Sequence, residues 1–337
     1  MTMTVYHLGR TGEIAGGMTQ VINDYLQWTF PGSSQKLIVS RGSGALATAR
    51  LFFSARSSIS RLSATAPNVV VAHLSQGGSF LREGALAILA RRRGLAVVAQ
   101  VHGSSFAAFS ARHPMLTRLV LMRAHVIHVL SDETREAVIA LGVPGEIVLI
   151  PNGVAPSPTP LKENLVVFGG AVTRRKGADV LLRAWQSLDQ IGDWRLVLAG
   201  PHREPDIVSS LPEGATAPGA LPRDELRELL SRARIAVLPS VDEAMPLFIL
   251  EALASSAAVV ATPVGGIPAV IDETTGRLIP VGDADSLASA LADLMTDAAT
   301  RDRLGAAGFA RWNSTYSAAA VVPQLEAAWM RALALRD

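Results

Sequence analysis

The chain has 337 residues, of which 49% are hydrophobic and 18% are charged, and it contains no cysteine. This length suggests about two domains, the composition is ordinary for a soluble α/β protein, and the lack of cysteine excludes disulfides and thiolate metal sites. The first residues lack the basic and apolar regions of a secretory signal, and no uncharged apolar run reaches the roughly 18 residues of a membrane span. We therefore expect a cytoplasmic protein.

Hydrophobic, β-branched runs alternate with helical patterns along the chain, which is typical of parallel sheets with helices on both faces. The predicted fold class is therefore α/β, with two doubly wound domains at 1–152 and 164–315, a proline-rich linker at 153–163 and an alanine-rich final helix at 316–337. Strands are predicted in chain order at 4–9, 35–40, 68–74, 95–102, 124–131, 147–151, 165–170, 194–200, 234–240 and 258–263.

Charge is distributed unevenly between the two halves. Residues 1–150 contain 14 Lys and Arg against 7 Asp and Glu, a net +7, whereas the remainder contains 17 against 22, a net −5. This asymmetry indicates that the first half meets an anionic partner. Basic residues are not interleaved with aromatic ones, which argues against nucleic acid as that partner.

The stretch SVDEAMPLFILEALA, residues 240–254, combines two glutamates with a change from strand to helix. Pro246 suits the first turn of the helix, so Glu243 falls in the preceding loop and Glu251 on the helix. Ligands of open α/β sheets bind at the carboxyl ends of strands, where two carboxylates suit the hydroxyl groups of a sugar or a ribose. The alternative is that Glu243 is a solvated loop charge and Glu251 a helix-face charge.

Ordered motifs over nearly the whole chain resemble one known family. The segments EAMPLFILEALASSAAVVATPVGGIPAVI and TGRLIPVGDADSLASAL are similar to the donor half of retaining glycosyltransferases of family 4. Further matches upstream follow the family's order: GEIAGG, IPNGV, GGAVTRRKG, LVLAG and PGALPRDELRELLSRARIAVLPS. The resemblance implies the GT-B fold, in which two Rossmann-like domains face a cleft, and a final helix that packs back on the first domain. It also implies transfer of a hexose-type sugar from a nucleoside diphosphate to a hydroxyl acceptor, with no metal or other cofactor.

Residue roles in the second half follow from the same resemblance. Lys176, where a strand gives way to a helix, would bind the diphosphate, an anion that a helix N-terminus also favours. Arg174 or Arg175 would supply a second cation, because Gly170 and Ala171 occupy the positions of the usual family arginine. The alternative for both arginines is an ordinary surface charge.

Glu243 would bond the donor sugar and Glu251 the ribose hydroxyls, with Glu243, Lys176 and His102 as the catalytic set. A covalent nucleophilic role for Glu243 stays open beside same-face attack guided by the leaving phosphate. Further donor contacts are expected from Gly219, Ala220 and Leu221 near the base, and from Ala244, Met245, Pro246 and Leu247.

In the first half, Gly16 and Gly17 follow the first strand, where a glycine pair lets backbone amides approach a phosphate. The alternative is an ordinary flexible turn. His102 ends a buried strand, and the resemblance places it near the reacting sugar, although a lone histidine there is usually structural. His73 has a weaker claim, and the remaining strand histidines are interpreted as structural: His7, His125 and His128.

Two other motifs are better explained without a ligand. The run GSGALA at 42–47 mimics a dinucleotide fingerprint, but no acidic residue follows at the required distance of about twenty positions. Asp283 and Asp285 mimic a metal-binding D-x-D motif, but a helical pattern follows directly, so a helix cap is expected.

The donor half also departs from the family pattern. Ala244 replaces a glycine, Ser256 and Ala258 replace a glycine and a proline, and Ala269 replaces a glutamate. Alanine in place of glycine costs little unless φ is positive. These changes motivate one alternative, a non-catalytic nucleotide-sugar binder. A GT-B epimerase or phosphorylase is another, although an epimerase needs acid–base carboxylates in the first half, where only Glu13 lies in a suitable loop.

Donor and location are weaker expectations. A UDP-sugar is favoured over GDP-mannose on family frequency alone. The basic, apolar segments 85–94 and 111–125 suggest that the first domain docks on an anionic inner membrane surface that presents a lipid-linked acceptor. The alternative is that both segments are helices covering the sheet, with their arginines merely solvated.

Overall fold

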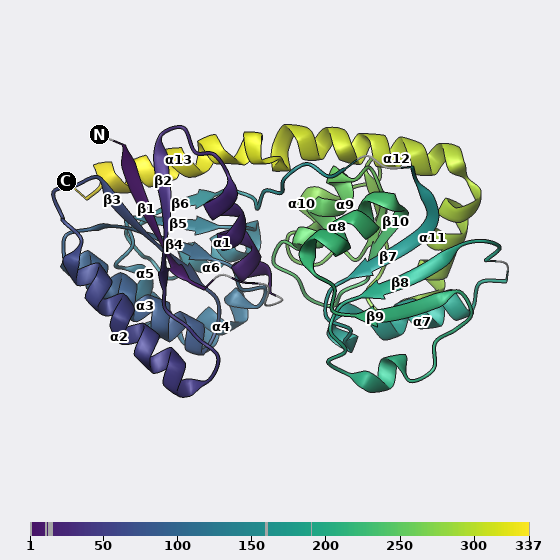
Figure 1. Cartoon of the computed structure of the whole chain (residues 1–337), viewed down its shortest axis with the longest axis horizontal. Helices are drawn as coiled ribbons and strands as arrows, with labels where there is room; N and C mark the ends of the chain where they lie inside the picture. Colours follow the sequence, from purple (N-terminus) through teal and green to yellow (C-terminus); the bar gives the residue numbers. More distant parts are fainter. Residues whose placement is uncertain (1, 11, 13–15, 159–160, 190, 337) are drawn as a thin grey trace. The chain divides into compact units, whose positions relative to one another are not determined.

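The computed structural model describes residues 2–10, 12, 16–158, 161–189 and 191–336. The chain divides into two compact units, one formed by Met1–Asn152 with Val321–Asp337 and the other by Gly153–Ala320 (Figure 1). Each unit contains a six-stranded parallel sheet whose strands alternate with helices. None of the described helices is both long enough and apolar enough to cross a membrane.

The first unit has the strand order β2-β1-β3-β4-β5-β6. Its strands are β1 (Met3–Gly9), β2 (Ser33–Val39), β3 (Asn68–Leu74), β4 (Ala96–Val101), β5 (Val126–Val129) and β6 (Glu146–Leu149). Its helices are α1 (Gly17–Gln27), α2 (Ala45–Arg61), α3 (Gly78–Arg92), α4 (Phe106–Arg112), α5 (Pro114–Leu121), α6 (Asp132–Ala140) and α13 (Ala318–Ala334), of which α13 enters this unit at Val321.

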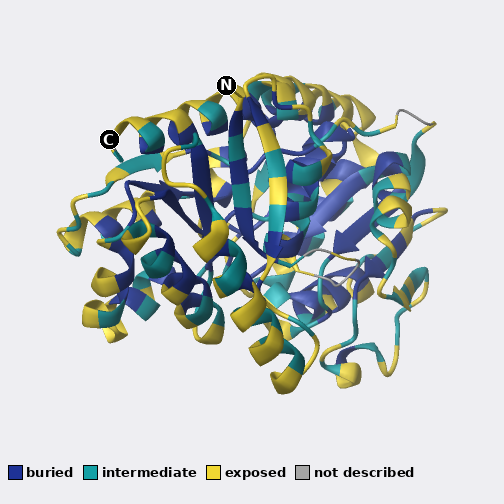
Figure 2. Cartoon of the chain, turned by 60° about the vertical axis from the view of Figure 1, so that its left-hand side comes forward, coloured by how far each residue is buried: buried dark blue, intermediate teal, exposed yellow. Residues whose placement is uncertain are grey.

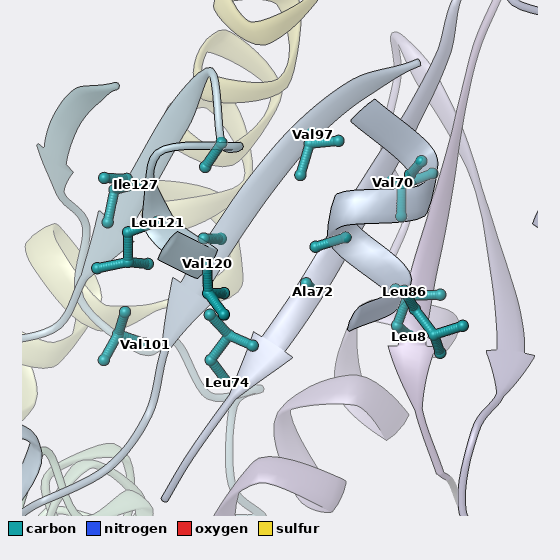
Figure 3. Close-up of a cluster of buried hydrophobic side chains, with 14 of the residues drawn as sticks. Leu8, Val70, Ala72, Leu74, Leu86, Val97, Val101, Val120, Leu121 and Ile127 are labelled. Atoms are coloured by element: carbon teal, nitrogen blue, oxygen red, sulfur yellow. The ribbon is translucent and has the colours of Figure 1, made fainter. Parts of the chain in front are cut away.

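The core of this unit follows from the strand sequences. β3 and β4 are buried at every position, as expected for central strands with both faces covered (Figure 2). Successive side chains alternate between the faces, and Val70, Ala72 and Leu74 lie with Leu86 of α3 in one apolar cluster (Figure 3).

On the other face of the sheet, aromatic residues of α1 and α13 cover β1. Trp329 of α13 is almost fully buried, with its ring 5.9 Å from His7 and 5.1 Å from Phe30. Glu326 of α13 accepts hydrogen bonds from Ser33 Oγ and Gly32 N at 2.8 and 2.9 Å. The last helix is therefore part of the first unit's core.

The second unit has the strand order β12-β11-β10-β7-β8-β9. Its strands are β7 (Glu163–Gly169), β8 (Arg195–Ala199), β9 (Ala215–Gly219), β10 (Ala233–Leu238), β11 (Ala258–Ala261) and β12 (Gly276–Leu278). Its helices are α7 (Ala178–Gln186), α8 (Arg223–Arg232), α9 (Leu247–Ala254), α10 (Ile267–Val270), α11 (Ala284–Thr296) and α12 (Ala298–Arg311). Shorter turns are the 3₁₀ segments η1 (Arg174–Lys176) and η2 (Pro205–Val208) and the π-helical segment η3 (Trp312–Tyr316).

Chain order in this sheet reverses between β7 and β10. β8 and β9 extend it on one side of β7, and the chain then returns to place β10, β11 and β12 on the other. This is the order of a Rossmann sheet, and the loops that follow β7 and β10 flank its switch point, where such sheets bind ligands.

The structure corrects several predicted boundaries. β7 begins at Glu163, so the segment before it ends one residue earlier than predicted. Pro246 is the N-cap of α9 rather than a residue of its first turn. Two strands were not predicted: β9 is a half-exposed edge strand that contains a proline, and β12 has only three residues.

Candidate functional site

The loops after β7 and β10 bring Lys176 and Glu243 together at the switch point of the second unit. Lys176 Nζ forms an ion pair with Glu243 Oε1, and the two side chains are 16% and 8% exposed. Glu243 Oε1 also accepts a hydrogen bond of 2.8 Å from Ser240 Oγ. Glu243 is therefore a buried, paired carboxylate and not the solvated loop charge of the alternative interpretation.

Close backbone approaches hold these loops in place. Gly177 has φ +73°, and a Cβ there would lie 2.0 Å from the carbonyl oxygen of Pro239, so η1 reaches the end of β10 only because this residue is glycine. Val241 N donates a hydrogen bond of 2.9 Å to Arg175 O, which links the two loops directly. The position of Lys176 beside Glu243 is thus set by the backbone.

A third loop, after β11, supports the one that carries Glu243. Gly265 has φ +53°, and a Cβ there would lie 1.5 Å from the carbonyl oxygen of Glu243. Gly266 N donates a hydrogen bond of 2.6 Å to Ala244 O, and Thr262 Oγ1 donates one to Ser240 O. The glycine pair of the V-G-G-I-P turn therefore lets this loop pack directly on the backbone of the Glu243 loop.

Glu251 lies on α9, and its side chain is 7% exposed. Its Oε1 pairs with Arg223 Nη2 at 3.3 Å, and Arg223 is the first residue of α8. Arg223 was not predicted as a site residue, because in the sequence it is one of several charges in a strongly polar helix. Arg223 begins α8 just after the loop Gly219–Leu221, in which Gly219 has φ +88°.

Arg174 is not brought into this cluster by any contact in the described residues. Its side chain is 58% exposed, and its guanidinium pairs with Glu204 at 2.8 Å and Asp206 at 2.5 Å. The hydrogen bond from Arg174 lowers the pKa of the Asp206 carboxyl. Arg175 donates a hydrogen bond of 3.0 Å to Asp242 O.

Two departures from the family pattern have different structural consequences. Ala244 does not have a positive φ, so alanine there carries no left-handed strain. Ser256 does, at +54°, and it is the one described non-glycine residue with a positive φ. The D-x-D mimic is a helix cap, as predicted, since Asp283 accepts a hydrogen bond from Ser286 N.

In the first unit, His102 is the end of a hydrogen-bonded chain that crosses the sheet. His102 Nε2 lies 2.8 Å from His73 Nδ1, and His73 Nε2 lies 2.9 Å from His7 Nδ1. His7 Nε2 lies 3.0 Å from Gln35 Oε1, and Gln35 Nε2 donates to Ser33 Oγ at 2.8 Å. Through Ser33 the chain reaches Glu326 of α13.

The carboxylate of Glu326, which can only accept, sets the direction of every hydrogen bond in the series from Ser33 to His102. Ser33 must donate to it and therefore accepts from the amide group of Gln35, which turns Gln35 Oε1 toward His7. With the histidines neutral, each ring then donates through Nε2 and accepts through Nδ1. His102 is left with an unprotonated Nδ1, which is a hydrogen-bond acceptor.

Burial keeps these rings neutral at ordinary pH. It lowers the pKa of His7 to about 4 and that of His102 to about 3, and it lowers the pKa of His73 well below its usual value. His125 accepts from Val97 N and His128 contacts Ile150 O, which fits their predicted structural roles.

The glycine loop after β1 is described only in part. Gly16 is the N-cap of α1 and Gly17 its first residue, and a Cβ at either would meet no atom within 4 Å. Residues 13–15 of the predicted loop, with Glu13, lie outside the described residues. Among those described, no group of three or more His, Asp or Glu side chains is arranged to hold a metal ion.

Comparison with known proteins defines the class and then the family. Residues 163–297 match the family model described as Glycosyl transferases group 1, and residues 27–153 match the Glycosyl transferase 4-like domain. The molecule therefore has the GT-B glycosyltransferase fold, and the chain belongs to glycosyltransferase family 4.

Three similar proteins illustrate the family. Alpha-maltose-1-phosphate synthase of Mycobacterium tuberculosis is 37% identical over 180 residues, which cover 48% of this chain and 46% of that protein. D-inositol 3-phosphate glycosyltransferase of Corynebacterium diphtheriae is 34% identical over 176 residues, covering 48% and 41%. The chain thus matches less than half the length of these two relatives. The structure of Anabaena HepE in complex with UDP and glucose superimposes with a TM-score of 0.76 at 16% identity, over 96% of this chain and 98% of that one.

Proposed function

We propose that the chain is a retaining glycosyltransferase that moves a hexose-type sugar from a nucleoside diphosphate sugar to a hydroxyl acceptor. The observation that carries this proposal is the buried Lys176–Glu243 ion pair at the switch point of the second unit. A cation suits the diphosphate of such a donor, and an acceptor-only carboxylate suits the hydroxyls of its sugar. Donor binding would exchange the ion pair for these two contacts, so neither charge would be left buried and unpaired.

In the proposed reaction, the bond between the anomeric carbon and the β-phosphate oxygen breaks. The acceptor oxygen bonds to that carbon from the same face, and its proton passes to the leaving phosphate oxygen. Lys176 would stabilise the charge on the diphosphate, a contribution typically worth about 10²–10³ in rate. Glu243 would orient the sugar, and Glu251, held by Arg223, would bind the ribose. The reaction so written needs no metal.

The first unit would contribute the residues that the family resemblance indicates. Gly16 and Gly17 have room for a ligand at the N-terminus of α1, where backbone amides favour phosphate. His102 presents an Nδ1 lone pair, which is what a donor-sugar hydroxyl needs in order to donate a hydrogen bond. Arg174 would assist Lys176 only by exchanging its present carboxylate partners for phosphate.

We propose a UDP-sugar as the donor in preference to GDP-mannose, on family frequency. Calorimetry with UDP and GDP tests this preference. Tighter binding of GDP than of UDP would overturn it. Turnover of UDP-hexoses then tests the reaction. Glu243→Gln should bind UDP at least as tightly as the parent, because it removes the carboxylate that competes with the diphosphate for Lys176. It should lose transfer by about 10²-fold or more, because it removes the carboxylate that orients the sugar.

Lys176→Ala should lose both UDP affinity and transfer, whereas Arg183→Ala, which removes an exposed cation from α7, should lose neither. Wild-type transfer in Lys176→Ala and Glu243→Gln would refute the assignment. UDP binding with neither transfer of the sugar to an acceptor nor hydrolysis of the UDP-sugar would instead favour a non-catalytic binder.

We propose further that the protein serves cell-envelope or exported polysaccharide synthesis on the cytoplasmic face of the membrane, with a lipid-linked acceptor. Met115 and Leu119 on α5, in the basic and apolar segment 111–125, are 86% and 51% exposed. This exposure supports docking of the segment on anionic lipid. Each arginine near such a surface is worth about 1 kcal/mol. Changing Arg91, Arg92 and Arg93 to Glu should weaken co-sedimentation with anionic vesicles. Equal binding to neutral vesicles would refute the docking.

A further inference from the structure

A groove of about 920 Å³ opens within the first unit, beside the loops that follow β2 and β3 and the first turns of α1, α2 and α3. Its lining includes the basic and amide side chains of Arg41, Gln76 and Arg82, which are together called the basic end below. The run GSGALA, which mimics a dinucleotide fingerprint, also contributes to the lining through Gly42, Gly44 and Ala45. None of these residues has a role in the proposed binding of the donor.

The basic end contains hydrogen-bond donors that lack acceptors. Gln76 Nε2 and Arg82 Nη2 are both buried, and neither has a hydrogen-bond partner among the described residues. Leaving such groups unpaired is unfavourable, and more so for a charged group. Because both orphan groups are N–H donors, the ligand that would satisfy them is an acceptor of hydrogen bonds.

Arg82 is held rigidly for this purpose. Its Nε donates to Glu83 Oε1 at 2.9 Å, and the same oxygen accepts from Ser40 Oγ at 2.5 Å. Glu83 Oε2 accepts from Ser79 Oγ at 3.1 Å, and the carboxylate is 1% exposed. This buried carboxylate fixes one edge of the guanidinium and so holds the positive charge of Arg82 at the lining of the groove.

Positive charge accumulates around the basic end. Desolvation, together with the nearby charges of Arg41 and Arg82, lowers the pKa of Arg10, which follows directly after β1. Glu83 balances only one of these three cations, and no acidic side chain lines the groove in the part of the chain that is described. Three guanidinium groups that repel one another favour an anion that they can share.

Two helix N-termini that the proposed donor does not use add to this potential. α2 and α3 have glycine N-caps at Gly44 and Gly77, neither with a side-chain cap and neither followed by an acidic residue in the first turn. Their first amides are therefore left for another acceptor. Uncapped N-termini beside arginines are a common way to bind phosphate.

The lining also has large apolar side chains, beside the small polar ones of Thr48, Ser75 and Ser79. Met18, Phe52, Phe53 and Leu81 form this apolar wall, in which Phe53 is 63% and Leu81 54% exposed. Large apolar side chains gathered beside an anion site are costly to hydrate unless a ligand covers them. A small inorganic anion would leave this wall uncovered.

We propose that this groove binds a phosphate ester whose phosphate lies at the basic end and whose apolar chain lies along the apolar wall. The charges of Arg41 and Arg82 attract the phosphate, and its oxygens accept from Gln76 Nε2 and Arg82 Nη2 once small side-chain rotations expose these buried atoms to the groove. The inference rests on the proposed function only in naming this ligand as the acceptor of the sugar. The predicted acceptor is thus an alkyl- or prenyl-type phosphodiester or diphosphate ester whose head group, beyond the phosphate, carries the hydroxyl that reacts.

Calorimetry on the full chain tests the site with decyl phosphate, decyl glucoside and inorganic phosphate. Decyl phosphate should bind at least about tenfold more tightly than either of the others, because only it offers both the charge and the chain. Arg41→Glu should weaken decyl phosphate by about tenfold or more. The matched control is Arg56→Glu, an exposed arginine of α2 that does not line the groove, and it should change nothing.

Two further variants separate the parts of the site. Gln76→Glu keeps the shape of the side chain but replaces a donor with an acceptor, so it should lose phosphate affinity. Phe53→Ser should weaken decyl phosphate and leave inorganic phosphate unchanged. Equal binding of decyl glucoside, or wild-type affinity of Arg41→Glu for decyl phosphate, would overturn the proposal. UDP binding should be unchanged in all these variants, and a protein that bound decyl phosphate but no nucleotide would refute the proposed function and not this site.

Discussion

Gly265→Ala should inactivate the protein although Gly265 touches no substrate in the proposed mechanism. The new Cβ would lie 1.5 Å from the carbonyl oxygen of Glu243. Ordinary contact begins near 3.4 Å, so the Glu243 loop or the Gly265 turn must move by about 2 Å. Because Glu243 is bonded to Lys176 and Ser240, such a shift would disturb the whole cluster.

The expected loss of transfer is about 10²-fold or more, since a displacement of about 1 Å at a reacting group already costs about that much. The positive φ of +53° adds about 1–2 kcal/mol of strain in the folded state. Strain alone would lower stability without a specific effect on the reaction. The two effects therefore need a control that has the strain and lacks the clash.

Gly282→Ala provides this control, because Gly282 has φ +79° but no atom within 4 Å of the position of its Cβ. Both variants should lose stability to urea from the backbone strain, and Gly265→Ala should lose more because of its clash. Only Gly265→Ala should lose release of UDP from a UDP-hexose. Activity in Gly265→Ala equal to that of Gly282→Ala would show that the packing of the two loops does not position Glu243.

Three further outcomes are expected. Ser256→Gly should raise the free energy of unfolding by about 1 kcal/mol, because it relieves a φ of +54° at an exposed side chain, and an unchanged urea midpoint would contradict this. Trp329→Ala should destabilise the first unit by about 3–5 kcal/mol, as measured by urea unfolding, and a smaller loss would mean that α13 is not part of its core. Acidification should destabilise the first unit between pH 6.5 and about 4, because the unfolded state binds protons there that the folded state excludes from His7, His73 and His102. The free energy of unfolding should fall by up to about 1.4 kcal/mol per pH unit for each histidine. A urea midpoint that stays constant over this range would show that the three histidines are not held neutral in the folded protein.

The sequence was sufficient for the central strands of both sheets. β3 and β4 are continuous apolar runs with both faces buried, so their pattern has one explanation. β9 and β12 escaped prediction because an edge strand needs little apolar sequence: ATAPG is half exposed and GRL has three residues. Their pairing is decided by the neighbouring strand and not by their own composition.

Parts of the site could be anticipated and parts could not. Lys176 and Glu243 were each expected to contact a ligand. Their direct pairing was not expected, because it depends on β7 and β10 lying side by side in the sheet, which the local sequence around each residue does not show. Arg223 and Gln76 gave no signal, because a partner distant in the chain or an unpaired buried amide is visible only after folding. The glycine spacing of V-G-G-I-P was a usable signal for the contact between Gly265 and Glu243.

The return of α13 makes the first unit discontinuous in the chain. During synthesis, residues 2–152 leave the ribosome with the face around His7 and Tyr25 uncovered, and Trp329 arrives only after Gly153–Ala320 has been made. At ordinary translation rates this interval is on the order of ten to thirty seconds. The nascent chain therefore exposes an apolar surface for that long, and co-translational folding has to complete the second unit's polypeptide before the first unit can close its core.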